Sequence, residues 1–235
     1  MIKEALQYLI GLGNTRTEEV GGQILSTQPM HVIDEPTCKA IVVHSLSGLV
    51  QYLKSEFDGS QTLMIHVEDP TTVNVLTNFT RDRKRNLLVQ AKAMIPEFRC
   101  DKWYGAEDFN IKPQSVFVTN AHRDDMLKVV GNIKDENVAT FGDDGVSQQV
   151  TAKTGVATVG SVKVPNPVKL APYRTFVEVR QPESNFVFRM RSGPECALFE
   201  SDGGAWKVEA MDTVQQYLQK ELDEQIEAGT IVLIA

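Results

Sequence analysis

The sequence predicts an α+β protein, with antiparallel sheets, a few amphipathic helices and a Gly/Pro-rich extended segment. Runs with apolar residues at helical spacing occur beside short runs of β-branched residues. The connections between several β-runs are too short to hold a crossover helix, which favours antiparallel pairing. Between residues 142 and 172 the chain becomes rich in Gly, Pro, Ser, Thr and Val, which predicts extended backbone.

The composition is that of a globular protein. The chain has 235 residues, of which 42% are hydrophobic and 23% are charged, so it is long enough to bury a sizeable core. Its net charge is −7, which disfavours a general DNA binder because binding to phosphates needs a concentrated cationic face. This net charge does not exclude a local basic patch on the surface.

Cysteine spacing and hydropathy indicate the compartment. Cys38, Cys100 and Cys196 lie far apart and form no C-x-x-C pair, which argues against a zinc ribbon and against a secreted disulfide scaffold. Lys3 and Glu4 interrupt the apolar N-terminal run, as a signal peptide would not. No stretch approaches the roughly 20 apolar residues of a membrane span. We therefore expect a cytoplasmic protein with no membrane contact.

The elements expected before residue 142 follow from local signals. Glycines end a short N-terminal helix, Gly21-Gly22 indicates a hairpin, and Ser45 is placed to cap a helix that packs on a sheet. Residues 106–118 are ambiguous, because Pro113 argues against both an uninterrupted helix and a central strand there. The expected helices are Ile2–Leu12, Leu46–Phe57 and Asn120–Lys134, and the expected strands are Lys39–His44 and a meander of Leu63–Glu68, Thr72–Phe79 and Leu87–Ile95.

The last third of the chain reads as hairpins followed by a helix and a strand. Asp202-Gly203-Gly204 predicts a hairpin turn, and Asp212 is placed to cap a helix that ends at Gly229. The expected strands are Arg174–Val179, Asn185–Arg191, Cys196–Glu200, Ala205–Glu209 and the apolar Thr230–Ala235.

Three regions are expected on this pattern. Residues 1–141 form an N-terminal α+β region, residues 142–172 an extended Gly/Pro-rich arm or loop, and residues 173–235 a C-terminal region of hairpins, helix and strand. The three either stand apart or form one domain overall. Residues 142–172 and the apolar final strand are candidates for contacts between subunits. The candidate interface residues are Val146, Val150, Val162, Val164, Ile231 and Leu233.

No motif in the sequence indicates a catalytic or metal site. His66 and Glu68 fall on one side of a strand, but two ligands do not make a metal site, and structural or surface roles are favoured. His122 and the two acids that follow Arg123 suit the start of a helix better than a catalytic dyad. The sequence contains no nucleophile elbow, zinc-protease motif, phosphate loop or dinucleotide fingerprint. We therefore expect no catalytic residue, no metal and no cofactor.

The densest basic run of the chain lies between two expected strands. It could contact the phosphates of a nucleic acid or a nucleotide, or it could be an ordinary solvated loop whose charges protect the sheet edge. The run consists of Arg81, Arg83, Lys84 and Arg85.

Several strings together resemble the YfdQ-like family of phage and prophage proteins. They are Ser45-Leu-Ser-Gly-Leu49, Gly142-Asp-Asp-Gly-Val-Ser-Gln-Gln-Val150, Val164-Pro-Asn-Pro167, Ala171-Pro-Tyr-Arg-Thr-Phe-Val-Glu-Val179, Gln181-Pro182, Phe186-Val-Phe-Arg-Met190 and Asp202-Gly-Gly-Ala-Trp206. The resemblance covers most of the chain and implies a phage or prophage protein in the cytoplasm of an infected or lysogenic bacterium. That family has no known function, so the resemblance brings no site residue.

Two functions are expected on these grounds. The first is a non-enzymatic phage protein that self-assembles as a homo-oligomer through segment 142–172. The alternative is a nucleic-acid or nucleotide binder used early in infection, as an accessory of replication or recombination or as an inhibitor of host defence, through the basic run at Arg81–Arg85. A hydrolase or nuclease built on His66 and Glu68 is the least favoured class.

Overall fold

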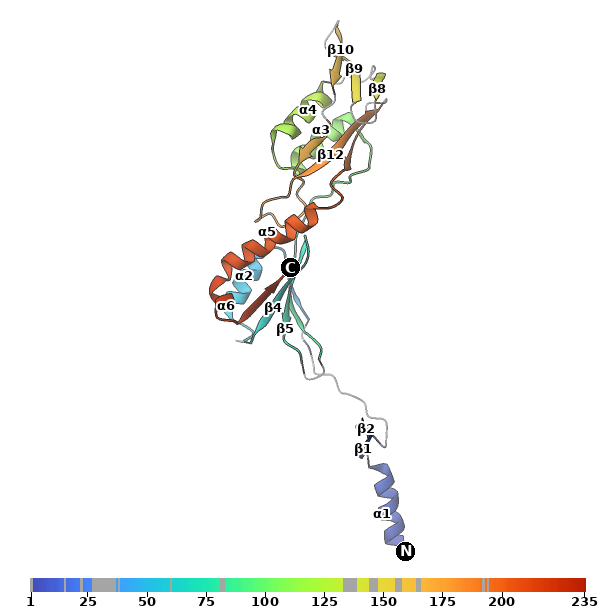
Figure 1. Ribbon diagram of the computed structural model, residues 1–235, viewed down its shortest axis with the longest axis vertical. Coiled ribbons are helices and arrows are strands. Elements are labelled where there is room, and N and C mark those ends of the chain that lie inside the picture. Colours follow the sequence, from blue (N-terminus) through green and yellow to red (C-terminus); the bar gives the residue numbers. More distant parts are fainter. Residues whose placement is uncertain are drawn as a thin grey trace. The chain divides into compact units, whose positions relative to one another are not determined.

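The chain divides into two compact units, Met1–Thr37 and Cys38–Ala235. The computed structural model (Figure 1) describes residues 2–14, 16–21, 23–26, 37, 39–59, 61–80, 83–132, 139–143, 148–154, 158–163, 166–191, 193 and 195–235. For the described residues between 139 and 163, only the backbone is described. The division into regions 1–141, 142–172 and 173–235 stays a prediction.

The N-terminal unit contains a helix and a hairpin. Helix α1 spans Ile2–Gly13, and strands β1, Thr17–Val20, and β2, Gln23–Ser26, pair antiparallel across Gly21. The expected helix and hairpin are thus confirmed. Gly21 has φ +60°, the left-handed conformation that hairpin turns require and glycine adopts at little cost.

The second unit contains a first sheet with the strand order β14-β4-β5-β6-β3. The expected meander forms its centre, with β4 and β6 antiparallel to β5. The edge strands β14 and β3 instead run parallel to their neighbours, because helices connect them to the sheet. The bounds are β3 Ile41–Val43, β4 Leu63–Asp69, β5 Thr72–Thr77, β6 Leu87–Lys92 and β14 Ile231–Ile234.

Helices cover one side of the first sheet (Figure 1). They are α2, Leu46–Ser55, α5, Trp206–Glu221, and the short α6, Asp223–Glu227. The cap predicted for α2 is confirmed, since the Gly48 N–H donates to Ser45 Oγ at 3.0 Å. This helix-on-sheet packing forms the first core, to which Leu46, Leu49, Leu53, Ile65, Val75, Val89, Val214, Leu218, Leu222 and Ile231 belong.

A second sheet, in the order β11-β12-β13-β7, lies against helices α3 and α4. All of its strand pairs are antiparallel. Aromatic rings dominate this second core: Phe109 stacks on Phe188 with ring centroids 5.5 Å apart, and Phe98 meets Phe117 edge to face. The bounds are β7 Tyr104–Gly105, α3 Ala106–Val116, α4 Ala121–Gly131, β11 Val168–Leu170, β12 Ser184–Arg191 and β13 Glu195–Glu200.

A third sheet has the antiparallel order β10-β9-β8. Its strands are β8, Ala139–Asp143, β9, Gln148–Thr154, and β10, Thr158–Lys163, so β9 and β10 fall within the Gly/Pro-rich segment. Val150 and Val162 are directly paired across β9 and β10. Val146 and Val164 lie outside the described residues.

Two details of the helices were predicted wrongly. Phe57 was expected on the buried face of the helix after Ser45, but its side chain is 81% exposed. The helix ends at Ser55 because Glu56 adopts φ +50°, which turns Phe57 out. Pro113 was expected to interrupt a helix, yet α3 runs through it. The ring lies on the buried face with Phe109, and this burial offsets one missing backbone hydrogen bond.

Two segments next to strands of the second sheet also differ from the prediction. Residues 174–179 form turns and irregular backbone, not a strand. Residues 205–209 are not the second strand of a hairpin, because Ala205 is the N-cap of α5 and residues 206–209 form its first turn. The spacing of Trp206, Ala210 and Val214 is that of one helix face, and Asp212 lies inside this helix.

Candidate functional site

The connection between β11 and β12 passes from the second core to the first and back. Near its start, the Val118 N–H donates to the Ala171 carbonyl at 2.9 Å. Phe176 and Val179 then enter the first core. Ser184 returns the chain to the second sheet as the first residue of β12. We call residues 171–183 the connector, and it is the place where the two cores meet.

Arg174 is the centre of a polar network at this junction. Its side chain is only 8% exposed. Nη1 donates to Glu200 Oε1 at 3.0 Å, and Nη2 donates to the Pro182 carbonyl at 3.3 Å and to the Ser184 hydroxyl. The guanidinium carbon lies 3.9 Å from the centroid of the Trp206 ring. One cation thus contacts the connector, β12, β13 and the start of α5.

Asp202 extends the network to the turn before α5. The Ser184 hydroxyl donates to Asp202 Oδ2 at 2.5 Å, and the Gly204 N–H donates to Oδ1 at 3.0 Å. Burial alone would raise the pKa of Asp202. These two hydrogen bonds and the charge of Arg174 outweigh burial, so the pKa lies below its ordinary value. Burial lowers the pKa of the Arg174 guanidinium, and Glu200 and Asp202 act against that shift.

Gln181 fixes the backbone of the connector. Its Oε1 accepts from the Arg174 and Thr175 N–H groups at 3.0 and 3.2 Å, and its Nε2 donates to the carbonyls of Phe176 and Val179. The Thr175 hydroxyl donates to the Pro70 carbonyl at 2.5 Å, which ties the connector to the turn between β4 and β5. The backbone of this buried turn pairs with no strand. The Gln181 side chain instead supplies the hydrogen-bond partners of these four backbone groups.

A second tie links the connector to α2. Glu178 Oε1 accepts from both the N–H and the hydroxyl of Ser47, at 3.1 and 3.2 Å. A carboxylate suits this place because the positive end of a helix lies there. The junction as a whole is built to hold the two cores together, since its cation, carboxylates and hydroxyl bind one another.

The sequence did not predict this junction, although it carried a signal. Ser47, Arg174, Gln181 and Trp206 lie in four separate strings of the sequence. The structure brings these separate strings to one place. One signal could have indicated the junction: several side chains that can form hydrogen bonds lie in a region that was predicted to be a plain strand.

The basic run lies in the connection between β5 and β6. Arg83 has φ +57° and is exposed. Arg85 is used structurally: its guanidinium lies 4.1 Å from the centroid of the Phe79 ring, and Nη1 donates to the Thr77 carbonyl at 3.2 Å. The Phe79 side chain is itself 63% exposed. Arg81 lies outside the described residues.

The acids near His66 are engaged in local hydrogen bonds. Glu68 Oε2 accepts from Asn74 Nδ2 at 2.6 Å on the neighbouring strand, and Asp69 Oδ1 accepts from Thr71 in the turn. Asp124 contacts Arg123, and both are near the start of α4. Among the described residues, no three His, Cys, Asp or Glu side chains come together as metal ligands.

The two interface candidates of the final strand face inward. Ile231 is 4% exposed and Leu233 packs against the first core. The residues that alternate with them, Val232 and Ile234, are 49% and 40% exposed. If side chains of this strand contact another molecule, Val232 and Ile234 are therefore the ones that do so.

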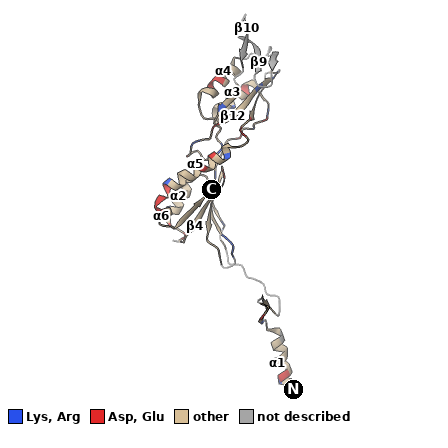
Figure 2. Cartoon of the chain, viewed as in Figure 1, with Lys and Arg blue, Asp and Glu red and all other residues tan. Residues whose placement is uncertain are grey.

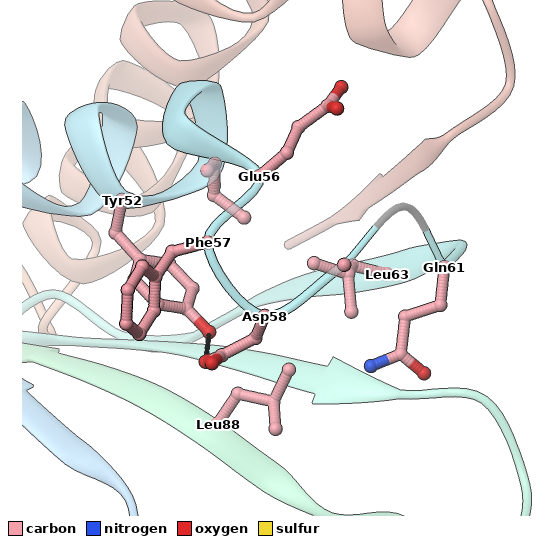
Figure 3. A pocket seen from close by; sticks show the side chains of 9 residues that line it. Tyr52, Glu56, Phe57, Asp58, Gln61, Leu63 and Leu88 are labelled. Atoms are coloured by element: carbon pink, nitrogen blue, oxygen red, sulfur yellow. Dashed lines mark hydrogen bonds between the residues drawn. The ribbon is translucent and has the colours of Figure 1, made fainter.

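A shallow hollow lies where α2 ends above the first sheet (Figure 3). Its empty space, counted together with the open solvent above it, is about 250 Å³. Within it the Tyr52 hydroxyl donates to the Asp58 carboxylate. The remaining lining is mainly apolar, and its size suits one side chain better than a cofactor. The lining residues include Leu53, Phe57, Leu63 and Leu88.

No protein-family model matches the chain, no curated protein matches it, and no solved structure matches it. Within the part of the chain that the structure describes, no helix is both long enough and apolar enough to cross a membrane.

Proposed function

We propose that this protein is a non-enzymatic phage or prophage protein that works as a homo-oligomer in the cytoplasm of its bacterial host. The observation that carries the proposal is the apolar surface of the N-terminal unit. Its phage origin rests on the resemblance to the YfdQ-like proteins.

The N-terminal unit exposes apolar side chains on both of its elements. On α1, Ile2, Leu6, Leu9 and Ile10 are between 53% and 80% exposed. On β1 and β2, the exposed apolar residues are Val20, Ile24 and Leu25. A helix and a two-stranded hairpin of this size are marginal alone in water, so the unit gains its stability by binding.

Another copy of the chain is the partner that the composition of α1 favours. Its apolar residues follow helical spacing, and its charged residues Lys3 and Glu4 cancel. A lipid-surface helix would instead carry a Lys/Arg-rich polar face. In Figure 2 most of the described part of α1 is tan, the colour of residues other than Lys, Arg, Asp and Glu. Pairing between such helices buries the stripes without placing an excess of one charge at the interface.

The test is the native mass of the full chain by mass photometry. We expect an oligomer at micromolar concentration, and we expect the double variant Leu6→Ser, Leu9→Ser to shift it toward smaller species. Gln7→Ser, on the same exposed helix, is the matched control and should keep the mass. A clean monomer of the unchanged protein would contradict the proposal, as would binding of α1 to neutral or anionic vesicles with no self-association.

The second candidate function, binding of single-stranded nucleic acid, is favoured by one observation. Phe79 is exposed and carries the guanidinium of Arg85 on its ring, beside Arg83 and Lys84. Aromatic rings next to cations are used to stack bases and contact phosphates. We expect Arg83→Glu with Lys84→Glu to remove binding and its salt dependence in an anisotropy titration, while Lys220→Glu on α5 has no effect. A lack of binding by the unchanged protein to oligonucleotides and cyclic nucleotides would exclude this function.

A further inference from the structure

Strand β14 is an edge strand without the features that protect sheet edges. It stands at the end of the order β14-β4-β5-β6-β3, paired with β4 on one side. Natural edge strands are guarded by charges, prolines or bulges. The segment Thr230-Ile-Val-Leu-Ile-Ala235 contains no charged residue and no proline, and its pairing with β4 has no register shift.

The backbone direction of β14 shows which groups face the open edge. The Thr230 carbonyl accepts from the Leu63 N–H of β4 at 2.9 Å. Backbone groups alternate sides along a strand, so those of Val232 and Ile234 also point toward β4. The N–H and C=O groups of Ile231 and Leu233 therefore point away from β4. Within the described part of the chain no strand pairs with these groups, so they can pair with a strand of another molecule.

We propose that β14 pairs antiparallel with β14 of a second copy, so that the first sheets of two subunits become continuous. This deepens the proposed function, since it rests on self-assembly and names one of its contacts. A second copy suits this edge for two reasons. The chain carries a net charge of −7, yet this strand is uncharged, so two copies meet here without like charges opposite each other. The exposed Val232 and Ile234 side chains of both copies then cover one another.

The geometry restricts the register of this pair. Residues directly opposite in an antiparallel pair point to the same face of the sheet. The inward residues of one copy must therefore lie opposite inward residues of the other, so the two-fold axis passes through a residue. An axis at Val232 or at Leu233 gives the longest overlap of the two strands. With the axis at Val232, Ile231 and Leu233 of opposite copies exchange backbone hydrogen bonds. The two Val232 residues then form a close, non-hydrogen-bonded pair.

The first experiment adds an edge charge. Val232→Lys places an ammonium on the outward face without touching the core, and in the dimer it brings like charges together. We expect mass photometry to show this interface lost, with the native mass lowered to half or less. Val208→Lys, on an exposed position of α5, adds the same charge and should keep the mass. Unchanged mass in Val232→Lys would overturn the self-pairing.

The second experiment maps the register by oxidation in a Cys38→Ser background. Val232→Cys should form a covalent dimer if the axis passes through Val232, and a mixture of Val232→Cys and Ile234→Cys proteins should cross-link if it passes through Leu233. Val208→Cys is the control that should stay uncross-linked. A link between Val232→Cys and Val42→Cys would place β3 of a neighbour at this edge and overturn the antiparallel pair. If the unchanged protein assembles and Val232→Lys keeps its mass, the β14 contact is wrong and the proposed self-assembly stands. A monomeric unchanged protein removes both.

Discussion

The guanidinium of Arg174 stacks on the indole of Trp206, with 3.9 Å between the guanidinium carbon and the ring centroid. Arg174 belongs to the connector that enters the first core, and Trp206 is the first residue of the helix that covers that core. The contact therefore joins two of the chain segments that pass between the cores. Because Arg174 also binds Glu200 on β13, unfolding of either core removes partners from the other.

Arg174→Ala is expected to destabilise the whole second unit. It leaves the carboxylates of Glu200 and Asp202 and the hydroxyl of Ser184 without their shared cation. The loss is about 3 kcal/mol of the free energy of unfolding. Urea denaturation followed by tryptophan fluorescence measures it. Trp103 packs on Phe199 beside the second core, and Trp206 reports on the junction.

Two further variants at arginine positions separate the network from a general effect of charge. Arg180→Ala removes an exposed arginine of the same connector and should change stability by no more than about 0.5 kcal/mol. Arg174→Lys keeps the charge but not the planar fork, so we expect most of the loss to remain. Equal stability of Arg174→Ala and Arg180→Ala would contradict the assigned role.

Asp202 is expected to make the unit sensitive to acid. Its folded-state pKa lies below the ordinary value of 3.8, so its ionised form is bound more tightly in the folded state. The stabilisation is present above the unfolded-state pKa and is lost as the pH falls through the folded-state pKa. Asp69 and Glu183, whose pKa values are also lowered, act in the same direction.

The measurement is the denaturant midpoint between about pH 7 and pH 2. Asp202→Asn should lower stability near neutrality and flatten the decline below about pH 4. Asp212→Asn, at an exposed position of α5, should keep the slope of the unchanged protein. A steeper decline in Asp202→Asn would show that this carboxylate does not stabilise the folded state.

Signals close together in the sequence predicted the fold well. The Ser45 cap, the meander β4-β5-β6 and the Gly21 hairpin each depend on a few adjacent residues. The turn at Asp202-Gly203-Gly204 was recognised, but its consequence was not. Both glycines have positive φ, which suits a hairpin as well as the entry to α5. The helical spacing that begins at Trp206 decides between them.

The junction could not be predicted in the same way. Arg174 and Glu200 are 26 residues apart, and Thr175 and the Pro70 carbonyl are 105 apart. No periodic pattern relates such positions, because a tertiary hydrogen bond depends on how the two cores dock. Edge strand β14 is an intermediate case. Its apolar run predicted the strand. Only the sheet order shows that β4 is its partner and, from that, which side of the strand faces outward.

The end of α2 gives a direct comparison between two apolar residues of one predicted helix face. Leu53→Ala should cost about 2–4 kcal/mol in the free energy of unfolding, because Leu53 is buried in the first core. Phe57→Ala should change it by no more than about 0.5 kcal/mol, since the ring is exposed. Both values come from urea denaturation. A comparable loss in the two variants would mean that the helix continues past Glu56 and buries Phe57.

The two cysteines of the second core are expected to resist thiol reagents. Burial, followed by the charges of Glu200 and Asp101, raises the pKa of the Cys100 thiol to about 11. Burial, with Glu195, raises that of Cys196 to about 12. At pH 8 roughly one thiol in a thousand or fewer is then a thiolate, which is the reactive form. In a Cys38→Ser variant, Ellman's reagent should therefore react slowly with the native protein and rapidly with both thiols in guanidinium chloride. Fast reaction of one thiol in the native protein would show that the second core opens at that cysteine on the time scale of the assay.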